Sequence, residues 1–139
     1  MSQENVEIVR RAIDAFNQRD VDDLVRDWDP EIELDWSRSR GLEAGIYRGQ
    51  EAVLGFWKTF FEMFDRATVS PEEFIECREH VLVPNRTYFR GRDGVTVEAQ
   101  SVMVATLRNG RIVEWRLYQE MAQALEAAGL SEQDAHADS

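Results

Sequence analysis

Two tight-turn signals between residues 81 and 119 constrain the fold of this chain more than any other feature. Arg92-Asp93-Gly94 suits a three-residue hairpin loop in which Gly94 takes the left-handed conformation. Asn109-Gly110 suits a two-residue turn of the primed type. We therefore expect three consecutive antiparallel strands, with a register that the two turns set.

Counting back from the turns predicts which residues share a face. Across Asn109-Gly110, Val104 should pair with Trp115 and Val102 with Leu117; across the other loop, Tyr88 should pair with Glu98 and Arg86 with Gln100. One face then mixes apolar and polar side chains and should form the floor of a small-molecule cavity: Arg86, Tyr88, Glu98, Gln100, Val102, Trp115, Leu117 and Gln119. A slip of one residue at the Asp93 loop would move Arg86 and Tyr88 to the other face.

The opposite face carries Phe89, Val97, Met103 and Tyr118. These side chains would leave a large apolar patch in water if nothing covered them. We therefore predict a homodimer packed through this outer face.

Helical spacing dominates the first half of the chain. Val6, Val9, Ile13 and Phe16 indicate a first helix, Asp20 can cap a short second helix that reaches Trp28, and residues 51–64 indicate a third. Trp57 and Phe60 of the third helix should roof the cavity. A strand at 32–36, a loop at 37–49, a strand at 68–77 broken by Pro71, and a last helix at 121–128 complete the order.

This order predicts an α+β fold in which a curved antiparallel sheet wraps around the N-terminal helices as a cone-shaped barrel. We expect one domain over residues 1–130 and a disordered tail at 131–139.

Composition excludes several function classes. The net charge of −11 argues against nucleic acid and anionic membranes as partners. Cys77 is the only cysteine, so an internal disulfide is impossible. No signal peptide, metal-ligand spacing or cofactor-binding fingerprint is recognisable, which predicts a cytoplasmic protein without a cofactor.

Four segments resemble the nuclear transport factor 2-like superfamily, in the branch of SnoaL-like polyketide cyclases, ketosteroid isomerases and limonene epoxide hydrolases. They are Ile8–Asn17 with Asp20, Asp29–Glu33, Tyr47–Val53 and Asn109–Arg116. The resemblance covers roughly residues 3–130 and implies a cone-shaped fold with one cavity. It specifies function poorly, because this fold hosts many unrelated activities.

In ketosteroid isomerases a general-base Asp ends the first strand, and Asp35 matches that position. The positions of the oxyanion-holding Tyr and Asp read Ala12 and Val102 here. One Asp of the epoxide hydrolases would lie where Leu117 stands and another near Tyr88, so that set is absent. The resemblance therefore implies a possible base without implying either of these two reactions.

Two function classes stay open. The first is an enzyme doing acid–base chemistry of isomerase, cyclase or lyase type on a small hydrophobic carbonyl compound, with Asp35 as base and Arg86 or Tyr88 as electrophilic partner. The second is a protein that binds a small hydrophobic or polyketide-like molecule without chemistry. Structural alternatives compete for each residue: Asp35 as an exposed acid, Arg86 in an ion pair with Glu98 or Asp35, and Tyr88 as an ordinary half-buried tyrosine.

Overall fold

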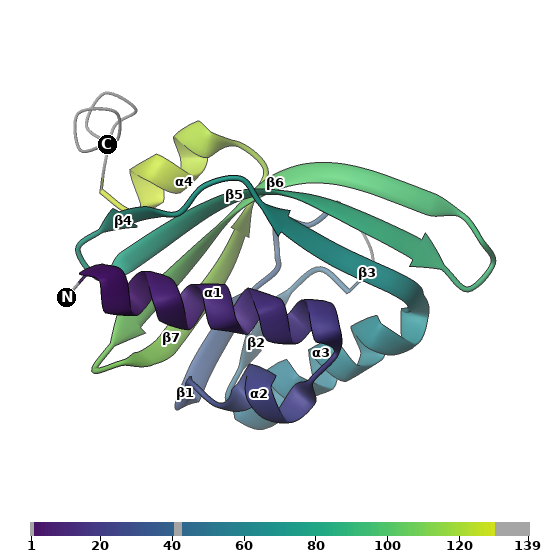
Figure 1. Ribbon diagram of the computed structural model, residues 1–139, viewed down its shortest axis with the longest axis horizontal. Helices are drawn as coiled ribbons and strands as arrows, with labels where there is room; N and C mark the ends of the chain where they lie inside the picture. The colour runs from purple at the N-terminus through teal and green to yellow at the C-terminus, as the bar shows by residue number, and fades with distance from the viewer. Residues whose placement is uncertain (1, 41–42, 130–139) are drawn as a thin grey trace.

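The computed structural model describes residues 2–40 and 43–129. Within these residues the helices are α1 (Ser2–Gln18), α2 (Val21–Val25), α3 (Gln50–Met63) and α4 (Met121–Ala127). The strands are β1 (Trp28–Asp35), β2 (Ile46–Arg48), β3 (Phe64–Pro71), β4 (Ile75–Cys77), β5 (His80–Gly91), β6 (Thr96–Arg108) and β7 (Arg111–Tyr118). The predicted α+β class, with helices first and most strands later, is confirmed (Figure 1). The predicted tail at 131–139 lies outside the described residues.

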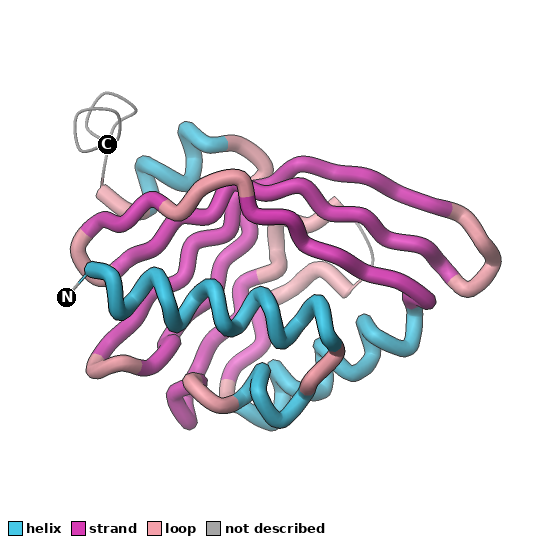
Figure 2. The backbone as a smooth tube through the Cα atoms, viewed as in Figure 1, coloured by secondary structure: helices cyan, strands magenta, loops and turns pink. Residues whose placement is uncertain are grey.

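The strands form one curved sheet that does not close on itself (Figure 2). Their order is β2-β1-β7-β6-β5-β3, and β4 pairs with β5 beside this path. Neighbours run antiparallel except β1 and β7, which are parallel. The sheet is therefore mixed rather than purely antiparallel, because the last strand returns beside the first in the same direction.

Two boundaries differ from the sequence-based expectations. Trp28 does not belong to the second helix: it begins β1 and pairs with Ile112 of β7. Segment 37–49, predicted as loop, contains β2, which pairs antiparallel with β1. Long-range strand pairing outweighs local propensity at both places.

Both predicted turns are present. Gly94 has a φ of 90°, and Asn109 and Gly110 have φ values of 54° and 75°, as a primed turn requires. The register between β5 and β6 is the predicted one, with Tyr88 opposite Glu98 and Arg86 opposite Gln100.

A β-bulge in β7 overturns the predicted register between β6 and β7. Leu107 pairs with Ile112, but Thr106 pairs with Glu114, so Val113 is one residue too many for the partner strand. Beyond this bulge Trp115 lies opposite Ala105. The predicted pairing of Val104 with Trp115 is wrong by one residue, and one residue moves each later side chain of β7 to the other face relative to β6.

The two faces of the sheet are covered by different helices (Figure 1). Helices α1 and α3 cover the inner face and form the main core with residues that include Val81, Val83, Met103 and Leu117. Helix α4 covers part of the outer face, where Leu125 packs in one cluster with Leu82, Val102, Val104 and Tyr118.

Polar side chains fasten α1 to the rest of the fold. Asn17 donates its side-chain amide to the carbonyl of Val69 at 2.8 Å and accepts from the Val69 N–H at 2.8 Å. Arg19 donates to the carbonyls of Phe61 and Phe64 at 2.8 and 2.6 Å, at the end of α3. These bonds satisfy backbone groups at the edge strand β3 and at a helix C-terminus, which would otherwise lack partners.

Candidate functional site

A cavity of about 600 Å³ lies between the helices and the inner face of the sheet. Its walls come from elements that are distant in the sequence. The apolar lining residues are Ala12, Ile13 and Phe16 of α1, Leu24 of α2, Trp28, Ile32 and Leu34 of β1, Trp36 after it, Val53, Trp57, Phe60 and Met63 of α3, Phe64 and Val69 of β3, and Phe89, Val97, Ala99, Met103, Trp115 and Leu117 of the later strands.

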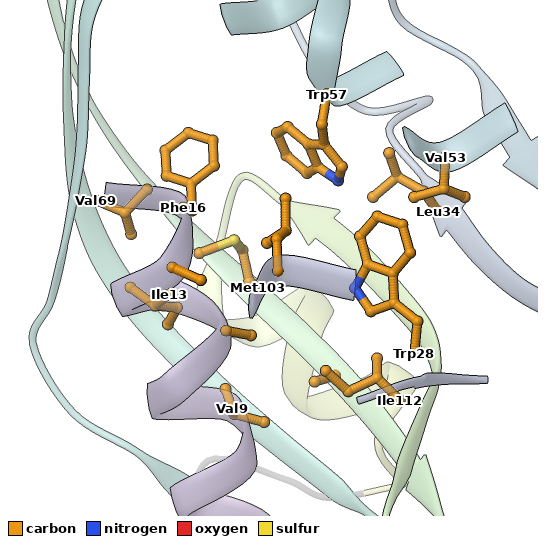
Figure 3. Close-up of a cluster of buried hydrophobic side chains, with 14 of the residues drawn as sticks. Val9, Ile13, Phe16, Trp28, Leu34, Val53, Trp57, Val69, Met103 and Ile112 are labelled. Atoms are coloured by element: carbon orange, nitrogen blue, oxygen red, sulfur yellow. The ribbon is translucent and has the colours of Figure 1, made fainter. Parts of the chain in front are cut away.

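Aromatic rings build the wall on the helical side (Figure 3). The ring of Trp57 lies 5.3 Å from Phe16 and 5.3 Å from Trp36, in edge-to-face geometry at both contacts. The ring centre of Phe60 lies 5.5 Å from that of Trp57 and 5.3 Å from that of Phe89, which belongs to β5. Interlocked rings of this kind hold a rigid shape, since each ring restricts its neighbours.

Polar residues also line the cavity: Ser39, Arg40, Thr87, Glu98, Gln100, Ser101 and Gln119. Arg40 and Glu98 are its ionisable lining residues within the described chain, and both are exposed. Gln119 donates from its side-chain amide to the carbonyl of Arg38 at 2.8 Å, which ties the end of β7 to the segment after β1.

Asp35 does not line the cavity. Leu34 pairs with Trp115 and lines it, whereas Asp35 pairs with Arg116, one residue further along both strands. Side chains alternate along a strand, so Asp35 points to the opposite side from Leu34. Asp35 therefore cannot act as a base on a molecule in this cavity, because a base on β1 would have to be on the side of Leu34.

The surroundings of Asp35 also hold it in the ionised form. Its carboxylate accepts from the Ser37 hydroxyl at 2.5 Å, the Ser37 N–H at 3.1 Å and the Arg38 guanidinium at 3.1 Å. Burial raises the pKa of Asp35, but these hydrogen bonds and the Arg38 charge outweigh burial and leave the pKa below its usual value. The raised pKa that a general base would need is not what this geometry produces.

Arg86 and Tyr88 lie on the outer face, so the predicted assignment of these two residues to the cavity face is wrong. Thr87 and Phe89, which alternate with them along β5, are the residues that line the cavity. Arg86 is exposed and pairs with Glu72 at 3.7 Å, rather than with the predicted Glu98 or Asp35. Val102 also points outward, into the cluster beneath α4.

The structure brings together the other predicted ligand-binding residues around one cavity: Trp57, Phe60, Glu98, Gln100, Trp115, Leu117 and Gln119. Trp115 and Leu117 reach it because the bulge turns them toward the side of Met103, not because they share a face with Arg86. Phe89, Val97 and Met103, which were predicted to form an outer dimer face, line the cavity instead. Tyr118 alone of that set lies on the outer face.

Sequence reasoning missed several lining residues. The sequence pattern predicts Trp28 in a helix and Met103 on the outer face. The signal for the inner face was present in β5 and β6, because Phe89, Val97 and Met103 are more apolar than the alternating set that contains Arg86 and Glu98.

Within the described residues, no group of three or more His, Cys, Asp or Glu side chains is placed to bind a metal ion. A second hollow of about 640 Å³ is lined mainly by charged and polar side chains, including Glu33, Glu114, Arg108 and Arg111. Two of its carboxylates contact arginines outside the hollow: Glu33 accepts from Arg48 at 3.1 Å, and Glu114 lies 3.3 Å from Arg116.

Residues 9–115 match the SnoaL-like domain family. The chain belongs to this family. The match spans α1 through β7, which are the elements that build the cavity.

Solved structures share this architecture. A nuclear transport factor 2-like protein of unknown function from Burkholderia pseudomallei is 23% identical, with a TM-score of 0.77 over 91% of this chain and 97% of that one. A nuclear transport factor 2-like protein from Burkholderia xenovorans is 28% identical, with a TM-score of 0.71 over 92% and 97%. TerC, co-crystallised with polyporic acid, is 19% identical, with a TM-score of 0.75 over 91% and 98%. At such identities these likenesses establish the fold.

No curated protein is similar enough to this chain to count as a match. Among the described residues, none of the helices combines the length and apolar character needed to cross a membrane.

Proposed function

We propose that this SnoaL-like protein binds a small hydrophobic molecule in its interior cavity and holds it without converting it. The observation that carries the proposal is the placement of charge. Arg40 and Glu98, the ionisable lining residues of the described chain, are exposed, while the interior wall consists of aromatic and aliphatic side chains. A wall of this kind favours burial of apolar surface and supplies no buried acid or base for proton transfer.

Two further points support binding. A volume of about 600 Å³ lies within the usual range of about 300–1,000 Å³ for small-molecule pockets. TerC, which shares the fold, was co-crystallised with polyporic acid, and another protein of this fold was crystallised in complex with trimethylamine.

The alternative is an enzyme doing acid–base chemistry on a small hydrophobic carbonyl compound. Glu98 is the carboxylate among the described lining residues, and it would replace Asp35 as the candidate base, although it pairs with the outward-facing Tyr88. Turnover of any carbonyl compound by the wild type, abolished in Glu98→Gln, would favour this alternative over passive binding.

The test of the binding proposal is titration with fluorenone, followed by quenching of tryptophan fluorescence. Ala12→Phe should fill the cavity and weaken binding at least tenfold, because Ala12 lines it. Ala52→Phe makes the same change on an exposed site of α3 and should leave binding unchanged. Circular dichroism checks that both variants fold. Absence of binding by the wild type, or equal binding by the two variants, would overturn the proposal.

The homodimer remains a prediction, but the residues that would form its interface differ from those predicted from the sequence. Because Phe89 and Met103 turn toward the cavity, the outer face beyond α4 presents Arg86 and Tyr88 instead. Light scattering at micromolar concentration tests this, and a monomer would contradict it.

A further inference from the structure

The chain has four tryptophans, and two of them, Trp28 and Trp57, are nearly buried. Trp28 and Trp57 are 3% and 9% exposed, and both line the cavity. Within the described residues, neither indole N–H donates a hydrogen bond to a protein atom. Trp115 differs, because its N–H donates to the sulfur of Met103 at 3.1 Å.

The indole N–H groups of Trp28 and Trp57 lie at the wall of the cavity and are not enclosed by packed side chains. Among the described residues, Nε of Arg116 on the outer face is the one side-chain nitrogen that is fully shielded from solvent and makes no hydrogen bond, although it lies 3.3 Å from Glu114. Neither indole nitrogen is shielded in the same way. Figure 3 shows both indole nitrogens (blue) on the ring edges that are turned toward the interior of the cluster. Trp36 also lines the cavity but is half-buried, beside exposed residues of segment 37–40, so water can reach it.

An indole N–H is a donor that cannot accept, so its partner has to be an acceptor atom. A donor buried in an apolar wall without a partner is unfavourable. A carboxylate is a poor partner at this depth, because burial of an anion needs a cation and Arg40 lies exposed at the edge of the cavity. A neutral carbonyl oxygen fits, since it accepts without bringing a charge into the wall.

We propose that Trp28 and Trp57 donate their indole N–H groups to a carbonyl oxygen of the bound molecule. The cavity then selects neutral carbonyl compounds over hydrocarbons of the same shape. This inference rests on the proposed function and adds the chemical class of the ligand and the two residues that recognise it.

The experiment compares fluorenone with fluorene, which have the same ring system with and without a carbonyl oxygen. Because the two compounds differ in their affinity for water, the quantity to compare is the ratio of their dissociation constants, measured for each protein. The double variant Trp28→Phe/Trp57→Phe keeps two apolar aromatic rings and removes both donors. It should shift the ratio by about 3- to 10-fold against fluorenone, the range of one ordinary hydrogen bond.

Trp115→Phe is the matched control, because the Trp115 donor is already used by Met103. This variant should keep the wild-type ratio. The infrared carbonyl stretch of bound fluorenone should lie at lower frequency in the wild type and in Trp115→Phe than in the double variant.

If the double variant keeps the wild-type ratio, this inference is wrong. If the wild type binds both compounds in that case, the proposed function still holds. Binding of neither compound overturns the proposed function itself. If the double variant does not fold, ¹⁵N–¹H spectra of the wild type decide: fluorenone should move the indole protons of Trp28 and Trp57 downfield more than fluorene does, and equal shifts overturn the inference.

Discussion

The inner and outer faces of the sheet both carry apolar residues, but among the described residues the apolar cavity lies on the inner face. On the inner face, α1 and α3 lie over a curved sheet (Figure 1). Large aromatic side chains fill the space between these helices and the sheet. On the outer face, the short helix α4 lies close to the strands through Ala124 and Leu125, which are 0% and 2% exposed. Small residues allow close packing, whereas bulky rings on a concave surface leave space between them.

Charge separates the faces more sharply than hydrophobicity does. Beyond α4 the outer side carries paired ions: Asp35 with Arg38 at 3.1 Å, and Glu114 with Arg116 at 3.3 Å. Arg38 also lies over the ring of Tyr118, 4.4 Å from its centre. The inner wall has no comparable pair among the described lining residues. The ion pairs of the outer face therefore serve to stabilise the fold, whereas the apolar wall of the inner face is suited to binding a hydrophobic molecule.

The largest effect expected from breaking the inner face is that of Phe16→Ala. The ring of Phe16 lies within 5.9 Å of Trp57, Phe60 and Phe61, so its removal opens the aromatic wall. We expect a loss of about 3–5 kcal/mol in the free energy of unfolding, measured in urea. Val97→Ala, at a site on the same face that is 49% exposed, should change it by less than about 0.5 kcal/mol. A loss below about 1 kcal/mol for Phe16→Ala would mean that the wall does not support the fold.

The matching change on the outer face is Leu125→Ala. It should loosen α4 and lower the free energy of unfolding by about 2–4 kcal/mol. The affinity for fluorenone should stay within twofold of wild type, because α4 touches the sheet on the side away from the cavity. Glu126→Ala, on the exposed side of α4, controls for helix propensity. A large change in affinity would show that the two faces are coupled.

Asp35→Asn tests whether Asp35 is a structural ion rather than a base. A pKa lowered by folding means that the ionised carboxylate stabilises the native state above the unfolded pKa and loses this effect as pH falls through the folded pKa. We expect a loss of about 1 kcal/mol at pH 7, since hydrogen bonds to a charged group are lost or weakened, and a much smaller loss near pH 3. Urea unfolding at both pH values measures this. A carboxyl pKa of Asp35 above its usual value in NMR titration would contradict the assignment.

Arg86→Met should have the smallest effect and sharpens the assignment of the faces. The side chain is 68% exposed, and its pair with Glu72 at 3.7 Å lies in solvent. Stability should change by less than about 0.5 kcal/mol, and fluorenone affinity by less than twofold. An affinity loss comparable to that of the double tryptophan variant would place Arg86 in the cavity and refute the observed faces.

Local signals in the sequence were enough for most of the elements. The spacing of Val9, Ile13 and Phe16 predicted α1, and Asn109-Gly110 predicted a primed turn that is present with both φ values positive. The alternation Ile32-Glu33-Leu34-Asp35 also contained the correct orientation of Asp35, opposite to two buried aliphatic residues. The match of Asp35 to the position of a catalytic Asp in ketosteroid isomerases predicts the opposite orientation, and the structure contradicts it.

The sequence by itself determined the α+β class, the helices, the hairpin turns and the pairing of β5 with β6, because each depends on residues close to one another in the chain. Tertiary structure alone decided which side chains of β1 and β7 point to the interior. The bulge at Val113 shifts β7 by one residue against β6, and the parallel pairing of β1 with β7 sets Leu34 inward and Asp35 outward. Alternation in β5 and the start of β6 favours the side of Phe89 and Val97, but it could not fix the orientation of β7, because β6 and β7 contribute buried apolar residues to both faces. The choice came from where the helices and distant strands meet, a long-range packing decision that no short segment encodes.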